Sequence, residues 1–196
     1  MKLYLSKLEL APGLAQNPYE MHRALWRCFP HSPDACRSFL YRVAWGRVGA
    51  PLAALVQSQT APDTTAPADA VFLEPPKPFD TDRLAISPGD MLRFVLTVNP
   101  VKRLAKERCR VPLLRTDERE AWLRRKLEQA ADVRECNVVA SRNLHFRRRG
   151  EAGKVVIVTF AGVLQVKQTE TLKALLVQGI GPAKSFGCGL LSLARA

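Results

Sequence analysis

Tyr19 and His22 are the two residues whose types and spacing best suit catalysis. They stand three positions apart, so a helix would place both side chains on one face. An imidazole can take the proton from a ribose 2′-hydroxyl or give one to a departing 5′-oxygen, while a tyrosine hydroxyl or a cation can stabilise the charge that develops on phosphate. With Arg23 beside His22, the set predicts metal-free cleavage of RNA. The alternative is that His22 is merely a surface residue of a helix.

The glycine-rich run at 178–191 is a second candidate site. Two Gly-x-Gly pairs flank a lysine and a serine: Gly179, Gly181, Lys184, Ser185, Gly187 and Gly189. Glycine admits positive φ and close backbone approach, and successive N–H groups in such a turn can bind an anion. The spacing differs from that of a dinucleotide fingerprint and of a Walker A loop. The run predicts a phosphate-binding loop; the alternative is a helix that ends at Gly179, followed by a bulged terminal strand.

Positive charge is concentrated in the second half of the chain. The formal net charge is +12; residues 1–88 carry 9 Lys or Arg and 8 Asp or Glu, whereas residues 89–196 carry 21 and 10. This asymmetry predicts a polyanionic partner. Three consecutive arginines end a predicted strand. Because arginine forks suit phosphate, they predict a contact with nucleic acid. The alternative is a charged hairpin tip that is merely solvated. The predicted RNA-binding cations are Arg23, Lys102, Arg103, Arg108, Arg110, Arg142, Arg147, Arg148, Arg149, Lys167 and Lys184.

Several classes of protein are disfavoured by composition. The five cysteines are odd in number and form no Cys-x-x-Cys pair, so neither a disulfide framework nor a zinc site is indicated. No paired carboxylates or His/Asp cluster suggest a two-metal nuclease, and we predict neither metal nor cofactor. A metabolic enzyme that binds a free nucleotide through the glycine-rich run is disfavoured by the charge asymmetry. Without a signal-peptide pattern or an apolar run of about 18 residues, we expect a soluble cytoplasmic protein with no membrane partner.

The helix that must carry Tyr19 and His22 has a clear start signal. Asn17 can cap it, Pro18 suits the first helical position, and Glu20 has capping-box spacing. We predict a helix over 18–29, whose buried stripe repeats every four residues. Its members are Met21, Leu25 and Phe29.

The strand and helix patterns around it predict two similar domains. The first half should contain a strand at 2–10, the helix, strands at 39–45 and 52–57, a loop at 58–70 and a stiff proline-rich connector at 75–78. The second half should contain strands at 91–98, 133–149, 154–167 and 190–193, a helix at 117–131 capped by Thr116, a turn at 150–153, and a helix from Thr169 to Gly179. The order β-α-β-β-α-β is that of a ferredoxin-like fold. We therefore predict an α+β protein with two tandem ferredoxin-like (RRM-like) domains. The first domain spans 1–80 and is degenerate, with its second helix short or missing. A linker at 81–89 leads to the second domain, which spans 90–196.

With these residues identified, the chain resembles the CasE family of CRISPR precursor-RNA endonucleases, subunits of the type I-E Cascade complex. The matching segments are 3–7, the Asn-Pro-Tyr-Glu-Met-His of 17–22, 25–26, 29–30, 94–100 with Lys102, 110–113, 121–123, and the glycine-rich run from 179 through 193. The helix start and the glycine-rich run are specific to the family in combination.

The resemblance implies two ferredoxin-like domains, binding of the stem-loop in each CRISPR repeat, and cleavage at the 3′ base of its stem. It implies that the cut RNA is kept with other Cascade subunits and that the isolated protein is a monomer. The family's catalytic histidine falls on His22 and its assisting tyrosine on Tyr19. Its basic hairpin corresponds to the region ending at 147–149. Some members of the family use a lysine near the scissile phosphate, and in this chain that lysine could be Lys154, Lys167 or Lys184. The rival interpretation is an RNA-hairpin-binding subunit without catalytic activity.

Overall fold

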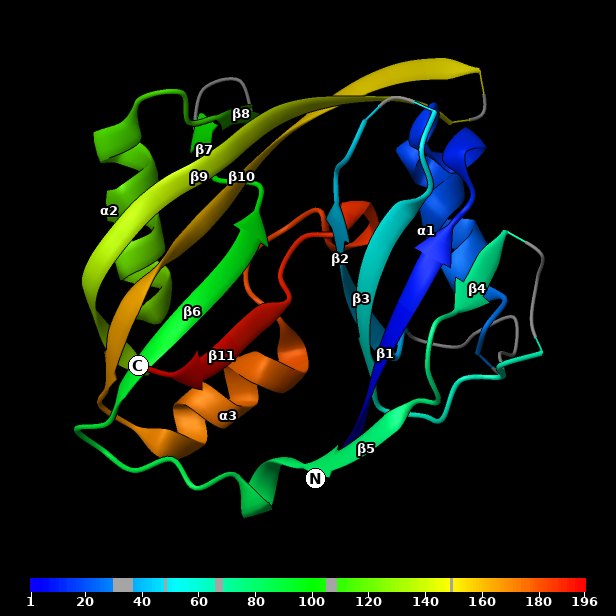
Figure 1. The fold of residues 1–196 in the computed structure, drawn as a ribbon. Helices are drawn as coiled ribbons and strands as arrows, with labels where there is room; N and C mark the ends of the chain where they lie inside the picture. Colours follow the sequence, from blue (N-terminus) through cyan, green and yellow to red (C-terminus); the bar gives the residue numbers. More distant parts are fainter. Residues whose placement is uncertain (30–36, 48, 66–68, 105–108, 149) are drawn as a thin grey trace. The chain divides into compact units, whose positions relative to one another are not determined.

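A computed structural model describes residues 1–29, 37–47, 49–65, 69–104, 109–148 and 150–196. They form two compact units. The first unit contains Met1–Leu84, His145–Lys154 and Lys184–Gly187, and the second contains Ala85–Leu144, Val155–Ala183 and Cys188–Ala196. Each unit has its own principal sheet (Figure 1).

The sheet of the first unit is antiparallel, with the order β2-β3-β1-β4. Its strands are β1 (Lys2–Leu10), β2 (Phe39–Ala44), β3 (Leu52–Ser58), β4 (Ala70–Phe72) and β5 (Lys77–Asp80). Strands β4 and β5 pair with successive parts of the same edge of β1, so together they take the place of a fourth strand. This is a ferredoxin-like strand order in which the described residues between β3 and β5 form no α-helix. The predicted loss of the second helix is therefore confirmed for that part of the chain.

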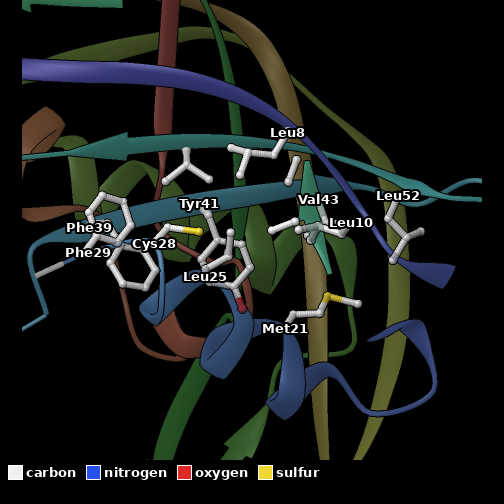
Figure 2. Packing of buried hydrophobic residues seen from close by; sticks show 13 residues of the cluster. Leu8, Leu10, Met21, Leu25, Cys28, Phe29, Phe39, Tyr41, Val43 and Leu52 are labelled. Atoms are coloured by element: carbon white, nitrogen blue, oxygen red, sulfur yellow. The ribbon is translucent and has the colours of Figure 1, made fainter. Parts of the chain in front are cut away.

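Helix α1 (Pro18–Trp26) packs its apolar stripe on this sheet. Figure 2 shows the cluster, in which Met21 and Leu25 of α1 meet side chains of β1, β2 and β3. Met21, Leu25 and Phe29 are at most 5% exposed, which confirms the predicted stripe. The helix itself ends at Trp26 rather than at Phe29, which lies in the turn that follows. Short 3-10 turns, η1 (Pro12–Ala15) and η2 (Thr81–Arg83), complete the unit together with η3 (Lys184–Phe186).

The proline-rich stretch that we predicted to be a connector is partly a strand. Lys77–Asp80 forms β5, with Pro78 opposite Tyr4 of β1. Proline lacks the N–H that an interior strand needs, but it is tolerated at the edge of a sheet. The predicted loop at 58–70 likewise gives way to β4 at its end.

The second unit has the strand order β11-β6-β10-β9. Its elements are β6 (Met91–Val98), α2 (Thr116–Leu127), β9 (Ala131–Arg148), β10 (Glu151–Val166), α3 (Thr169–Gln178) and β11 (Leu191–Arg195). Strand β6, the first of the four in sequence, lies in the middle of the sheet between β11 and β10, as the ferredoxin-like plan requires. The predicted β-α-β-β-α-β order is confirmed. The far ends of β9 and β10, which form the segment His145–Lys154, belong to the first unit.

Several local predictions in this half need correction. The helix predicted over 117–131 ends at Leu127, and the strand predicted from 133 begins at Ala131. A hairpin of β7 (Val101–Leu104) and β8 (Cys109–Pro112) lies in the basic stretch for which we predicted no strands. Arg115 occupies the cap position of α2, and Thr116 is its first residue. The turn between β9 and β10 is shorter than predicted, because β10 begins at Glu151. These are features of one to four residues, whose local patterns are weak.

No helix in the described part of the chain is both long and apolar enough to cross a membrane.

Candidate active site

His22 lies on α1 and is half-buried against two aromatic rings. The centroid of its ring is 5.4 Å from that of Trp26 and 5.8 Å from that of Phe39. Its Nε2 is shielded from solvent and has no hydrogen-bond partner among the described residues. Buried polar atoms in folded proteins are nearly always paired, so an unpaired imidazole nitrogen here calls for a functional explanation.

The surroundings of His22 keep its imidazole neutral. Burial lowers the pKa of His22 from its ordinary 6.5 to about 4, and the positive charge of Arg37 acts in the same direction. A neutral imidazole has a lone pair that can accept a proton. The side chain is therefore suited to act as a general base near neutral pH.

The segment Lys184–Gly187 of the glycine-rich run lies against α1 in the first unit. The hydroxyl of Tyr41 donates a hydrogen bond to the carbonyl oxygen of Ser185, at 2.7 Å. Gly187 has φ +78°, and a Cβ there would lie 3.2 Å from the ring of Tyr41, so this position needs glycine. The pKa of Lys184 is lowered by partial burial and then by Arg37. The predicted catalytic helix and the predicted loop lysine are far apart in sequence, and the fold of the first unit brings them together.

The tip of the β9–β10 hairpin also packs against the start of α1 and against η3. The side chain of Asn17 donates from Nδ2 to the carbonyl oxygen of Arg147, at 3.2 Å, and accepts from the Arg147 N–H through Oδ1, at 3.3 Å. The rings of Phe146 and Phe186 lie 4.7 Å apart. Gly153 lies under the Phe146 ring, where a Cβ would come within 2.2 Å of it. The start of α1, the hairpin tip and η3 therefore form one packed cluster in the first unit.

The predicted capping box at the start of α1 is wrong. Asn17 occupies the cap position, but its side chain makes no capping hydrogen bond and binds the Arg147 backbone instead. Glu20 accepts from Arg23 at 3.0 Å, so this carboxylate is not used for capping. Pro18 is at the start of the helix as predicted. Tyr19 is half-buried, one turn before His22.

Replacing Asn17 should loosen the hairpin tip without unfolding the unit. In Asn17→Ala both hydrogen bonds to the Arg147 backbone are lost, and each contributes about 0.5–1.5 kcal/mol. We expect the Arg147 amide to exchange with solvent about tenfold faster in hydrogen-exchange NMR. Asn17→Asp keeps the acceptor and should show a smaller increase. The control is Gln16→Ala, which changes an exposed neighbouring residue. Equal exchange of the Arg147 amide in all three variants would show that Asn17 does not hold the hairpin tip.

The glycine-rich run does not offer all of its amides to an anion. The N–H groups of Gly179, Gly187 and Gly189 donate to the carbonyl oxygens of Leu175, Lys184 and Thr97, at 2.9, 3.4 and 2.8 Å. These three amides are bonded inside the protein, so their N–H groups are not offered to an anion in this structure; that Gly179, Gly187 and Gly189 contact RNA stays a prediction. The alternative, that Gly179 ends a helix, is confirmed by its position after α3 with φ 74°. Gly181 and Ser185 remain predicted RNA contacts.

In the second unit, Arg103 and Arg110 line an open groove of about 450 Å³ together with Lys126, Trp122 and Gly181. These residues come from the β7–β8 hairpin, α2 and the glycine-rich run. This brings two of the predicted RNA-binding arginines to one cationic groove.

The other predicted cations are dispersed. Lys102 forms an ion pair with Glu118, at 3.0 Å, and Lys167 donates to the carbonyl oxygen of Glu128, at 2.9 Å. The exposed residue Arg142 lies on β9. Arg147 is exposed and Arg148 ends β9, whereas Arg108 and Arg149 lie outside the described residues.

Arg37 is the site residue that sequence reasoning missed. It precedes β2 as a single arginine, without a motif around it. Its relevance follows from its buried, unpaired Nε among the described residues and from its electrostatic effect on His22 and Lys184. Within the described ranges, no three His, Cys, Asp or Glu side chains gather closely enough to hold a metal ion.

Comparisons with known proteins cover almost the whole chain. The family described as "CRISPR associated protein" matches residues 3–195. The chain is 37% identical over 203 residues to CRISPR system Cascade subunit CasE of Escherichia coli, covering 98% of this chain and 99% of that protein. It is 37% identical over 214 residues to CRISPR-associated endoribonuclease Cse3 of Thermus thermophilus, covering 98% and 100%. Its fold matches the structure of Thermus thermophilus Cse3 bound to an RNA representing a pre-cleavage complex, with a TM-score of 0.87, 36% identity and full coverage of both chains.

Proposed function

The chain belongs to the CasE family of CRISPR-associated proteins, and we propose that it is a metal-independent endoribonuclease that cuts CRISPR precursor RNA. Its substrate is the stem-loop of the CRISPR repeat, cut at the 3′ base of the stem. The protein then keeps the mature guide RNA as a subunit of Cascade in the cytoplasm. In isolation it is a monomer, and it needs no cofactor.

The observation that carries the catalytic part of this proposal is the state of His22. Its imidazole is neutral, with a pKa of about 4 in the free protein, and its Nε2 is unpaired within the described part of the chain. It lies on the helix that packs against Lys184–Phe186. A proton acceptor beside cationic side chains is the arrangement that RNA transesterification requires.

The reaction is attack by the ribose 2′-oxygen on the adjacent phosphorus. The 2′-hydroxyl proton passes to His22, an O2′–P bond forms, and the P–O5′ bond breaks. The leaving 5′-oxygen takes up a proton, so that the products are a 2′,3′-cyclic phosphate and a 5′-hydroxyl. Tyr19 assists from one turn earlier on α1, and Lys184 stabilises the charge on the phosphate oxygens.

The stem is held mainly through its phosphates. A-form RNA hides its base edges in a deep, narrow groove, so affinity depends on cations such as those of the hairpin tip and the Arg103/Arg110 groove. In this proposal residues 1–80 form the domain with the catalytic helix, 81–89 the linker and 90–196 the domain with the basic hairpin and the glycine-rich run. Because most contacts lie on the stem, the protein keeps the product after the cut.

The proposal is tested with the purified protein, EDTA and two labelled CRISPR-repeat hairpins. One hairpin is all ribose, and the other has a 2′-deoxy residue at the cut site. We expect cleavage of the first alone, with a 2′,3′-cyclic phosphate end. Loss of cleavage in EDTA would overturn metal independence, and cleavage of the deoxy hairpin would overturn 2′-hydroxyl attack. Tight binding of both hairpins without cleavage would identify a non-catalytic RNA-binding subunit.

A further inference from the structure

Arg37 stands two residues before Phe39, the first residue of β2. The carbonyl oxygen of Ser38 accepts from the N–H of Gln59, at 2.8 Å, so the pairing of β2 with β3 continues beyond Phe39. Side chains two residues apart on an extended strand share a face. The electrostatic effect of Arg37 on His22 agrees with a position on the same side as Phe39, whose ring is 5.8 Å from that of His22.

The guanidinium of Arg37 lacks a partner for one of its donors. Its Nε is buried and unpaired among the described residues, as is Nε2 of His22. Native structures rarely bury a donor that makes no hydrogen bond. These two unpaired polar atoms, the donor Nε of Arg37 and Nε2 of His22, indicate a ligand that the described part of the chain does not supply.

The charges near Arg37 indicate that the ligand it binds is an anion. Arg37 lowers the pKa of both His22 and Lys184, which shows that its charge reaches both side chains. Among the described residues, Arg37 is the ionisable group that lowers the pKa of His22, and Tyr41 is the one that raises the pKa of Arg37. Neither of them is a carboxylate. Cations that lie close to one another favour an anionic ligand.

We infer that Arg37 binds a non-bridging oxygen of the scissile phosphate and holds that phosphate beside His22. The inference rests on the proposed function, whose cleavage site it deepens. A guanidinium fork matches the geometry of phosphate oxygens. Because negative charge on those oxygens grows as the 2′-oxygen attacks, the contact is stronger in the transition state than in the bound substrate.

The same contact tunes the base. Phosphate neutralises the charge by which Arg37 lowers the pKa of His22, so that this pKa rises when RNA binds. A base whose pKa lies nearer the working pH accepts a proton more effectively. Arg37 thus adds to the lowering of the His22 pKa by burial in the free protein, and its part of the shift is relieved once RNA is in place.

The test compares Arg37→Gln and Arg37→Lys with the wild type. Arg27→Gln is the matched control, since Arg27 forms an exposed ion pair with Asp69. Three quantities are measured: the single-turnover cleavage rate at saturating hairpin RNA, the affinity for the uncleavable 2′-deoxy hairpin, and the pKa of His22 by NMR, free and with that hairpin bound.

We expect Arg37→Gln to slow cleavage on the order of a hundredfold and to change the affinity by less than about threefold, because most contacts lie on the stem. In the free protein the pKa of His22 should rise from about 4 and remain below 6.5, since burial is its larger cause. Arg37→Lys should recover part of the rate. A rate equal to that of Arg27→Gln, or a slower rate with the pKa of His22 unchanged, would overturn the inference.

The two proposals fail in different ways. Absence of cleavage by the wild type would refute the proposed function, and the NMR comparison would still decide the role of Arg37. If the 2′-deoxy hairpin raises the pKa of His22 in the wild type and less in Arg37→Gln, the phosphate contact is supported. If the hairpin shifts that pKa equally in both proteins, the contact is refuted.

Discussion

Replacing His22 with alanine is expected to slow cleavage of the repeat hairpin by about a hundred- to ten-thousandfold, with little change in RNA affinity. The variant loses the imidazole that accepts the 2′-hydroxyl proton. It keeps the hairpin tip, whose arginines are predicted to contact the stem. The single-turnover rate at saturating RNA, measured in EDTA, isolates the chemical step from binding.

Two further variants separate chemistry from packing. Because His22 packs against the rings of Trp26 and Phe39, alanine removes packing as well as a base. His22→Phe preserves an aromatic ring there and should be equally inactive. His145→Ala removes an exposed histidine from β9 and should cleave at close to the wild-type rate at saturating RNA. A His22→Ala protein that cuts as fast as His145→Ala would show that His22 is not the base.

Replacing Arg147, Arg148 and Arg149 together with glutamine is expected to weaken binding of the hairpin RNA and to reduce its salt dependence. Each phosphate contact contributes about 0.9 to the slope of log K against log salt in a duplex. Loss of three contacts should therefore reduce the slope by about 2 to 3. The measurement is a series of binding titrations at several salt concentrations with the 2′-deoxy hairpin.

The control removes the same amount of charge elsewhere. Lys7, Arg27 and Lys77 each form an ion pair with a carboxylate. Replacing these three with glutamine should leave the slope nearly unchanged, because paired cations displace few counterions from RNA. Equal slopes for the two triple variants would mean that the hairpin tip does not hold the stem. At saturating RNA the hairpin-tip triple variant should cleave at a rate close to that of the wild type, in contrast to His22→Ala.

Local patterns in the sequence were sufficient to predict most of the elements. The period of Met21, Leu25 and Phe29 predicted which face of α1 is buried, because helix periodicity depends only on neighbouring residues. Alternating apolar residues predicted β6 in the same way. The order of the elements then implied the ferredoxin-like plan, since few topologies accommodate it. Short strands such as β4 and β7 were missed, because three or four residues carry little periodicity.

The pairing of donors and acceptors depended on the tertiary structure. Asn17 has the residue type and position of a helix cap, yet its side chain binds the backbone of Arg147, 130 positions away. The amides of Gly187 and Gly189 belong to a pattern typical of anion binding, yet they donate to carbonyl oxygens of the protein. A sequence shows which groups can form hydrogen bonds, and only the fold determines which of them meet.

The sequence by itself determined that Tyr19 and His22 share a helix and that cations dominate the second half of the chain. It could not indicate Arg37, because a single arginine before a strand has no distinctive spacing. The tertiary structure placed this residue within electrostatic reach of His22 and Lys184, which are 162 positions apart. Contacts over such separations depend on strand register and on how loops close, so the candidate residues came from the sequence and their association from the fold.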